Sequence, residues 1–143
     1  MAKKVSITRV VRVPAARIFD ALTDPGQHAL IDGSGSVRGA HGESTTRLKL
    51  GDTFGMDMRL GAPYRVKNRV VEYEEGTLIA WRHFAGHRWR WELKPIDEHS
   101  TEVTETFDYS TAPVPFLLEL AGFPERNRKG IQATLDRLES VLA

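Results

Sequence analysis

Residues 53–60, TFGMDMRL, and residues 88–95, RWRWELKP, place an apolar side chain at every second position. A period of two is typical of a β-strand with one buried face. Such runs follow one another with short, turn-like connections between them, and they predict the strands Thr53–Leu60, Tyr64–Tyr73, Thr77–Phe84, Arg88–Pro95 and Thr101–Tyr109. Because parallel pairing needs a long crossover, the short connections predict an antiparallel meander.

The segment before this meander predicts one further strand and two short helices. Residues 5–13 alternate apolar and polar side chains and stop at Pro14, which fits the first turn of a helix because it has no N–H to satisfy. Residues 14–23 then carry apolar side chains at helical spacing, and a second short helix is expected around residues 27–31. The glycine-rich residues 32–42 predict a loop with one short strand.

The apolar period changes to that of a helix near the end of the chain. A helix is predicted from about Pro124, with one apolar stripe formed by Ile131, Leu135, Leu138 and Leu142. A helix of this length is marginal alone in water, so we expect the stripe to dock on the sheet. Residues 112–124 are apolar and bounded by prolines, and they predict a loop with a helical turn that lies over one mouth of the fold.

Together these elements predict an α+β fold and a single domain spanning residues 1–143. We expect a curved antiparallel sheet of about six to seven strands around a long C-terminal helix, with two short helices after the first strand. A strongly curved sheet closing around one helix tends to leave a cavity. The pattern therefore favours a protein that holds a small hydrophobic molecule.

Composition argues against several other functions. The chain has 20 Lys and Arg against 19 Asp and Glu, a formal net charge of +1, so no nucleic-acid partner is expected. It has no cysteine, which excludes disulfides, thiolate nucleophiles and iron–sulfur clusters. No apolar stretch reaches the length of a signal peptide or a membrane span, so we expect a cytoplasmic protein without membrane insertion.

Metal and cofactor motifs are also missing from the sequence. His83 and His87 are four residues apart, but they flank a predicted turn instead of sharing a helix face, so no metal site is expected. Gly33-Ser34-Gly35 lacks the lysine and the strand–helix setting of a phosphate-binding loop. We therefore expect no bound cofactor.

Four segments of the chain resemble the START and birch-pollen-allergen-like superfamily, also called SRPBCC. They are VPAARIFDALTDP at 13–25, VVEYE at 70–74 with IAWR at 79–82, TEVTETFD at 101–108, and the helix at 127–138. The resemblance covers nearly the whole chain and is greatest to bacterial members described as polyketide cyclase/dehydrase-like. It implies a helix-grip fold whose cavity, between the sheet and the closing helix, binds lipids, polyketides or other hydrophobic ligands.

Strand and helix phase predict which side chains face such a cavity. The candidate ligand-binding residues are Phe54, Met56, Met58, Trp81, His83, Trp89, Trp91, Glu105, Phe107, Phe116, Leu120, Ile131 and Leu135. Methionine adapts to irregular apolar pockets, and a buried indole N–H needs a partner. The same stripes are also what a solid core requires, because apolar and aromatic side chains fill most protein interiors.

Glu105 is the first candidate for acid–base chemistry. It lies in phase with Phe107, so its carboxyl is expected inside the fold. A buried carboxyl needs a partner or takes a raised pKa, and a raised pKa suits a general acid or base. The structural alternative is an ion pair or hydrogen bond with a neighbour such as Arg82, His83 or Trp89.

His83 and Arg9 are two further polar candidates. His83 is in phase with Trp81 and could bond a ligand carbonyl or move a proton, or it could be an ordinary solvated side chain at the end of a strand. Arg9 interrupts an apolar strand face and is expected to pair with an acidic side chain or with a ligand carboxylate.

Three functions therefore remain open at the level of sequence. The first is a carrier or sensor for a small hydrophobic molecule such as a lipid, a polyketide or an aromatic metabolite. The second is a polyketide cyclase or dehydratase with Glu105 or His83 as the acid or base. The third is an interaction module, similar to the chaperone-activating members of the superfamily.

Overall fold

The computed structural model describes residues 3–34, 37–41, 47–60, 62–83 and 86–142. Its elements are β1 (Lys4–Val11), α1 (Ala15–Leu22), the 3-10 helix η1 (Pro25–Gln27), α2 (His28–Ile31), β2 (Val37–His41), β3 (Thr53–Leu60), β4 (Ala62–Glu74), β5 (Leu78–His83), β6 (Arg88–Pro95), β7 (Thr101–Asp108), α3 (Pro115–Leu120) and α4 (Phe123–Leu142). The predicted α+β fold is confirmed, and β2 is the short strand expected within residues 32–42. Gly35, Gly42 and Phe84, which belong to predicted segments, lie outside the described residues.

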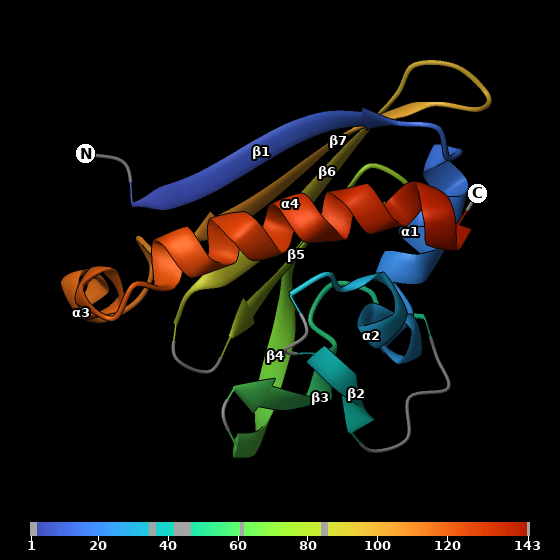
Figure 1. Cartoon of the computed structure of the whole chain (residues 1–143). Helices are drawn as coiled ribbons and strands as arrows, with labels where there is room; N and C mark the ends of the chain where they lie inside the picture. The colour runs from blue at the N-terminus through green and yellow to red at the C-terminus, as the bar shows by residue number, and fades with distance from the viewer. Residues whose placement is uncertain (1–2, 35–36, 42–46, 61, 84–85, 143) are drawn as a thin grey trace.

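The strands form one seven-stranded antiparallel sheet in the order β1-β7-β6-β5-β4-β3-β2. The strands β3 to β7 form the predicted meander, and β1 returns to pair with β7. The register shifts between Val70 and Glu72 in β4 and between Val37 and Gly39 in β2. Such irregularities bend a strand and increase its twist. In Figure 1 the sheet accordingly curves around α4, with β1 above this helix and β2 and β3 below it.

Helix α4 closes the core by burying the stripe predicted from its sequence. It packs against β1 and β7 and also contacts α1, α2 and α3. The residues of this helix that are removed from solvent are Ile131, Thr134, Leu135, Leu138 and Leu142. The change of period near residue 124 therefore predicted both the helix and the face by which it docks.

Two short helices fill the space beside the C-terminal half of α4 (Figure 1). Pro14 ends the first strand region and precedes α1, which buries Ile18, Phe19 and Leu22. The Asp24 carboxylate then accepts the Gly26 N–H at 3.0 Å and starts η1, a use of aspartate that is common at turns and helix starts. This turn carries α2 over the concave face of the sheet.

Helix α3 differs from the expectation for residues 112–124. The expected helical turn is present, but Phe116 and Leu120, two of the residues predicted to line the cavity, are 56% and 78% exposed. Lys3 Nζ and Tyr109 Oη donate to the two carboxylate oxygens of Glu119, at 2.5 and 3.1 Å. These bonds hold α3 with Glu119 and the partly buried Leu118 toward the rest of the fold, and they leave Phe116, Leu117 and Leu120 exposed.

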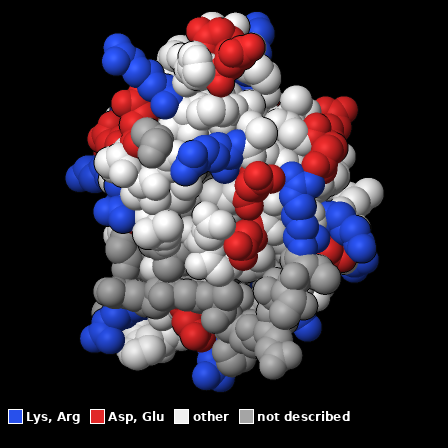
Figure 2. Space-filling model, turned by 90° about the vertical axis from the view of Figure 1, so that its right-hand side faces the viewer, with Lys and Arg blue, Asp and Glu red and all other residues white. Residues whose placement is uncertain are grey.

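The surface carries charges of both signs without a broad field of either. Figure 2 shows acidic and basic side chains interspersed around one face of the molecule. Ion pairs such as Arg47–Asp20, at 3.2 Å, join some of them. Among the helices of the described residues, none is long and apolar enough to cross a membrane.

Candidate functional site

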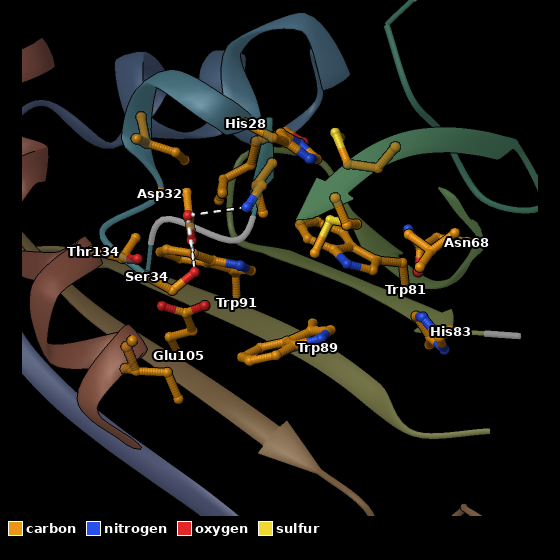
Figure 3. A pocket seen from close by; sticks show the side chains of 18 of the residues that line it. His28, Asp32, Ser34, Asn68, Trp81, His83, Trp89, Trp91, Glu105 and Thr134 are labelled. Carbon is orange, nitrogen blue, oxygen red and sulfur yellow. Dashed lines mark hydrogen bonds between the residues drawn. The ribbon is translucent and has the colours of Figure 1, made fainter. Parts of the chain in front are cut away.

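A cavity of about 130 Å³ lies between the concave face of the sheet and the helices α2 and α4 (Figure 3). An apolar cavity of roughly 150 Å³ in another protein holds one benzene molecule, so the space fits a single ring. The sheet contributes Val37, Phe54, Met56, Met58, Val66, Asn68, Trp81, His83, Trp89, Trp91 and Glu105. The helices and the segment after α2 contribute Leu22, His28, Ile31, Asp32, Ser34, Asn127, Gly130, Ile131 and Thr134.

Aromatic rings form one wall of this cavity. Trp81 and Phe54 meet edge to face with their ring centroids 5.5 Å apart, and the His28 ring stacks on Trp81 at 5.0 Å. Trp89 lies directly opposite Trp81 in the pairing of β5 with β6, which places both indoles on the concave face. Trp91 follows two residues later on the same face. The wall therefore offers flat, apolar surfaces of the kind that bind rings.

His28 fixes the position of α2 from inside the core. Its Nε2 lies 2.8 Å from the Leu22 carbonyl oxygen, and because a carbonyl can only accept, Nε2 carries the proton. Burial lowers the pKa of His28. The imidazole is therefore neutral at pH 7, with Nδ1 left as an acceptor.

Polar side chains gather at the opposite end of the cavity, where Glu105 points toward Asp32 and Ser34 (Figure 3). Glu105 is 6% exposed, and its buried Oε1 has no hydrogen-bond partner among the described residues. Burial, and after it the negative charge of Asp32, raises the pKa of Glu105 well above 4.5. The Asp32 carboxylate accepts Ser34 Oγ at 2.8 and 2.9 Å and the Val37 N–H at 3.4 Å.

The sequence predicted polar partners for both Glu105 and Arg9, and the structure provides one for Arg9 only among the described residues. No bond from Arg82, His83 or Trp89 to the buried Oε1 of Glu105 exists within the described part of the chain. Arg9 pairs with Asp136 on α4, at the surface and away from the cavity lining. Arg9 thus has an acidic partner, but this is an exposed acid and not the internal acid expected, and the described residues provide no hydrogen-bond partner for Oε1 of Glu105.

His83 lies at the end of the cavity away from Glu105 (Figure 3). Its ring stacks on His87, with centroids 4.3 Å apart and an interplanar angle of 15°. Burial lowers the pKa of each of these two histidines to about 4, and for His87 the proximity of His83 adds to the effect. Both rings are therefore uncharged at neutral pH, and His83, which lines the cavity, can hydrogen-bond a ligand without adding charge.

The cavity contains most of the residues that strand phase predicted. Its lining includes these candidates: Phe54, Met56, Met58, Trp81, His83, Trp89, Trp91, Glu105 and Ile131. Phe107 and Leu135 lie instead in the packed core, each 1% exposed, because neighbouring side chains cover them. Phe116 and Leu120 lie on the exposed side of α3. That the lining residues bind a ligand stays a prediction.

Several lining residues were not predicted from the sequence. Val66 and Asn68 share the concave face of β4 by their spacing, so strand phase alone would have found them. Thr134 lies beside the predicted stripe of α4 and was passed over as polar. His28 and Asp32 come from a segment without a clear period, and no local signal marks them.

Gly33 lets the segment after α2 approach α4 closely enough to close the cavity. Its N–H donates to Thr134 Oγ1 at 2.9 Å, and a Cβ at this position would lie 2.3 Å from the backbone carbonyl carbon of Ala133. We expect Gly33→Ala to lower the free energy of unfolding by roughly 1–3 kcal/mol, because the helix backbone cannot yield to the added methyl group. Urea unfolding measures the change, and a loss below about 0.5 kcal/mol would show that the close approach is unimportant.

No group of three or more His, Cys, Asp or Glu side chains able to hold a metal ion occurs in the described ranges. Most of the side chains that line the cavity are aromatic or aliphatic, with a few polar groups among them. This arrangement suits an organic ligand.

Comparison with known proteins gives matches along almost the whole chain. A family model described as polyketide cyclase/dehydrase and lipid transport matches residues 2–143. An uncharacterized protein of Mycobacterium tuberculosis is 40% identical over 145 residues, a match that covers 98% of this chain. The chain spans 64% of the length of that relative.

Solved structures with low sequence identity share the fold. A protein from Nitrosomonas europaea superimposes with a TM-score of 0.76 at 17% identity, covering 99% of this chain and 96% of that one. An AHSA1-like protein from Aeromonas hydrophila gives a TM-score of 0.66 at 19% identity, covering 96% of this chain and 92% of that one. At such identities the likeness concerns the backbone architecture alone.

Proposed function

Because the chain belongs to the polyketide cyclase/dehydrase and lipid transport family, we propose that it binds a small hydrophobic ligand in the cavity beneath α4. The observation that carries this proposal is the cavity itself, which is about 130 Å³ in volume and lined mainly by apolar and aromatic side chains. Small-molecule sites are typically concave and apolar with a few polar groups that orient the ligand. Here Glu105, Asp32 and Asn68 are groups of that kind.

The size of the cavity limits the ligand. A volume close to that of one ring excludes a fused polyketide as a fully enclosed guest unless the walls move. We therefore infer that the enclosed part of the ligand is a single ring or a short branched chain. Any longer portion would have to extend outside the cavity.

All three tryptophans of the chain line the cavity, so their fluorescence is a direct reporter of binding. We expect the neutral single-ring probe 2-phenylethanol to change the emission of Trp81, Trp89 and Trp91 saturably. Val66→Phe adds a ring to the cavity wall and is expected to weaken this binding at least about tenfold, since the probe loses its space. Isothermal titration calorimetry provides the same affinity without relying on the fluorophores.

Leu135→Met is the control for this experiment, because it conserves volume at a core position away from the cavity lining. It should bind the probe as the wild type does. Equal affinity of the wild type and Val66→Phe, with both variants folded, would refute binding in this cavity.

One observation favours a second function, which is acid catalysis on the bound ligand. Burial raises the pKa of Glu105 and so favours the protonated carboxyl, which can donate to a ligand carbonyl as a cyclase or dehydratase requires. This enzymatic role for Glu105 or His83 stays a prediction. It differs from the carrier function in requiring turnover, which Glu105→Gln would abolish while a ring-sized ligand still binds.

A further inference from the structure

The cavity has an unbalanced set of charges. Among the described residues that line it, two are acids, Asp32 and Glu105, and none is lysine or arginine. The other titratable lining groups are His28 and His83, and burial lowers the pKa of both, so neither carries positive charge at neutral pH. A ligand with a carboxylate would therefore meet like charge, whereas a ligand with a positive charge would not.

Glu105 is the lining acid beside which the described residues place no lysine or arginine. On β7 its pairing partners are Ile7 on β1 and Trp91 on β6, neither of which offers a cation. Across the cavity, Asp32 and Ser34 from the segment after α2 and the Thr134 hydroxyl of α4 face this end of the site, and Thr134 already accepts the Gly33 N–H. A carboxyl that is 6% exposed and lacks a described partner for Oε1 is costly to fold, yet it points into the cavity.

The aromatic wall beside Glu105 suits a cation as well. Trp91 lies directly opposite Glu105 in the register, and Trp89 lies on the same face two residues before it. An ammonium group near an indole face is attracted by the quadrupole of the ring, and the attraction increases when water is excluded. A carboxylate and two indoles around one small volume combine ion pairing with this interaction.

We propose that the ligand is a small protonated amine, whose ammonium group binds between Glu105, Asp32 and the indole of Trp91. This inference rests on the proposed function and adds the chemical class of the ligand to it. The apolar body of the amine, of about one ring, fills the space beside Phe54, Met56 and Trp81.

Besides a preference for amines over neutral ligands, we expect binding of such a ligand to release a proton. In the empty cavity, burial and the Asp32 carboxylate raise the pKa of Glu105 and so favour its protonated form. An ammonium group beside it favours the ionised carboxylate, so binding of the amine expels the proton of Glu105. The neutral rings of His28 and His83 and the uncharged side chains of α4 that line the cavity do not take part.

Calorimetric titration with three probes of the same ring tests the proposal: 2-phenylethylamine, 2-phenylethanol and 3-phenylpropionate. At pH 7 we expect the amine to bind at least about tenfold more tightly than the alcohol, and the carboxylate to bind more weakly than both. Titrating the amine in phosphate and in Tris should give different heats, because the two buffers differ in ionisation enthalpy and take up the released proton. Glu105→Gln should reduce the affinity for the amine to that for the alcohol and remove the buffer dependence.

Glu102→Gln provides the matched control, because it makes the same change on the opposite face of β7 and outside the cavity lining. It should leave the preference for the amine intact. If the alcohol binds and the amine binds no better, or if the carboxylate binds best, the cationic ligand is refuted while the proposed function stands. If none of the three probes binds, the proposed function fails and the inference fails with it.

Discussion

Glu105→Gln is expected to change the pH dependence of stability more than any other single charge change in the cavity. Burial, reinforced by Asp32, raises the pKa of Glu105 in the folded protein well above its ordinary value of 4.5. As the pH rises from 4.5 toward the folded-state pKa, the unfolded chain loses this proton and the folded protein keeps it. The wild type should therefore lose about 1.4 kcal/mol of stability for each pH unit in that interval through this group.

The glutamine variant has no proton to lose at this position, so its stability should lack that slope. The free energy of unfolding of Glu105→Gln, relative to wild type, is thus expected to increase steadily with pH above 4.5. Urea unfolding at a series of pH values measures both curves. The histidines with lowered pKa values, His28, His83 and His87, contribute a slope of the opposite sign below pH 6.5, but they do so equally in the two proteins.

Glu102→Gln is the control for this comparison too, because it removes a carboxyl from the other face of the same strand. The free energy of unfolding of Glu102→Gln should follow that of the wild type across the pH series, without the divergence expected for Glu105→Gln. Parallel curves for wild type and Glu105→Gln would mean that the pKa of Glu105 is not raised in the folded protein, and the account of Glu105 as a buried acid without a cation beside it would be wrong.

The sequence alone predicted the sheet because each strand exposes one face to the core. In β7 the alternation of Thr101, Val103, Glu105 and Phe107 placed a carboxyl inside the fold before any coordinates were considered. A period of two shows directly which side chains of a strand face the core, because a register shift of one residue would turn all of its apolar side chains to solvent. The inward position of Glu105 was accordingly predictable, whereas the absence of a described partner for it was not.

The helical side of the site depends on tertiary packing that local patterns do not show. His28 and Asp32 lie in and after α2, a helix too short to display a period. Their place at the cavity results from the approach of Gly33 to the backbone of α4, a contact between segments about a hundred residues apart. No single-sequence rule connects two such segments.

Apolar character alone did not separate core from surface near the end of the sheet. Phe107 and Phe116 were both predicted to line the cavity, yet one is 1% exposed and the other 56% exposed. Phe107 lies on the inner face of β7 opposite Trp89, whereas Phe116 lies on α3, a helix held by the bonds of Glu119 to Lys3 and Tyr109. Which side of a short helix faces the sheet thus depends on tertiary contacts that residue type does not reveal.

Phe107→Ala should therefore be among the most destabilising substitutions in this protein. The Phe107 ring contacts the rings of His87, Trp89 and Tyr109, with centroids 5.2, 5.0 and 5.5 Å away. Truncation removes these contacts and leaves a void that close-packed neighbours fill poorly, at a cost of about 3–5 kcal/mol. Calorimetry should show a fall in melting temperature on the order of 10 °C for a chain of this length.

Phe116→Ala makes the same chemical change on the exposed side of α3 and is expected to alter stability by no more than about 0.5 kcal/mol. The pair isolates burial from residue type, because only the surroundings of the ring differ. Similar losses in the two variants would indicate that α3 packs against an apolar surface in solution and that Phe116 is not free in solvent. A small loss for Phe107→Ala would instead show that the interior beneath α4 can rearrange, and the volume available to a ligand would then not be limited to one ring.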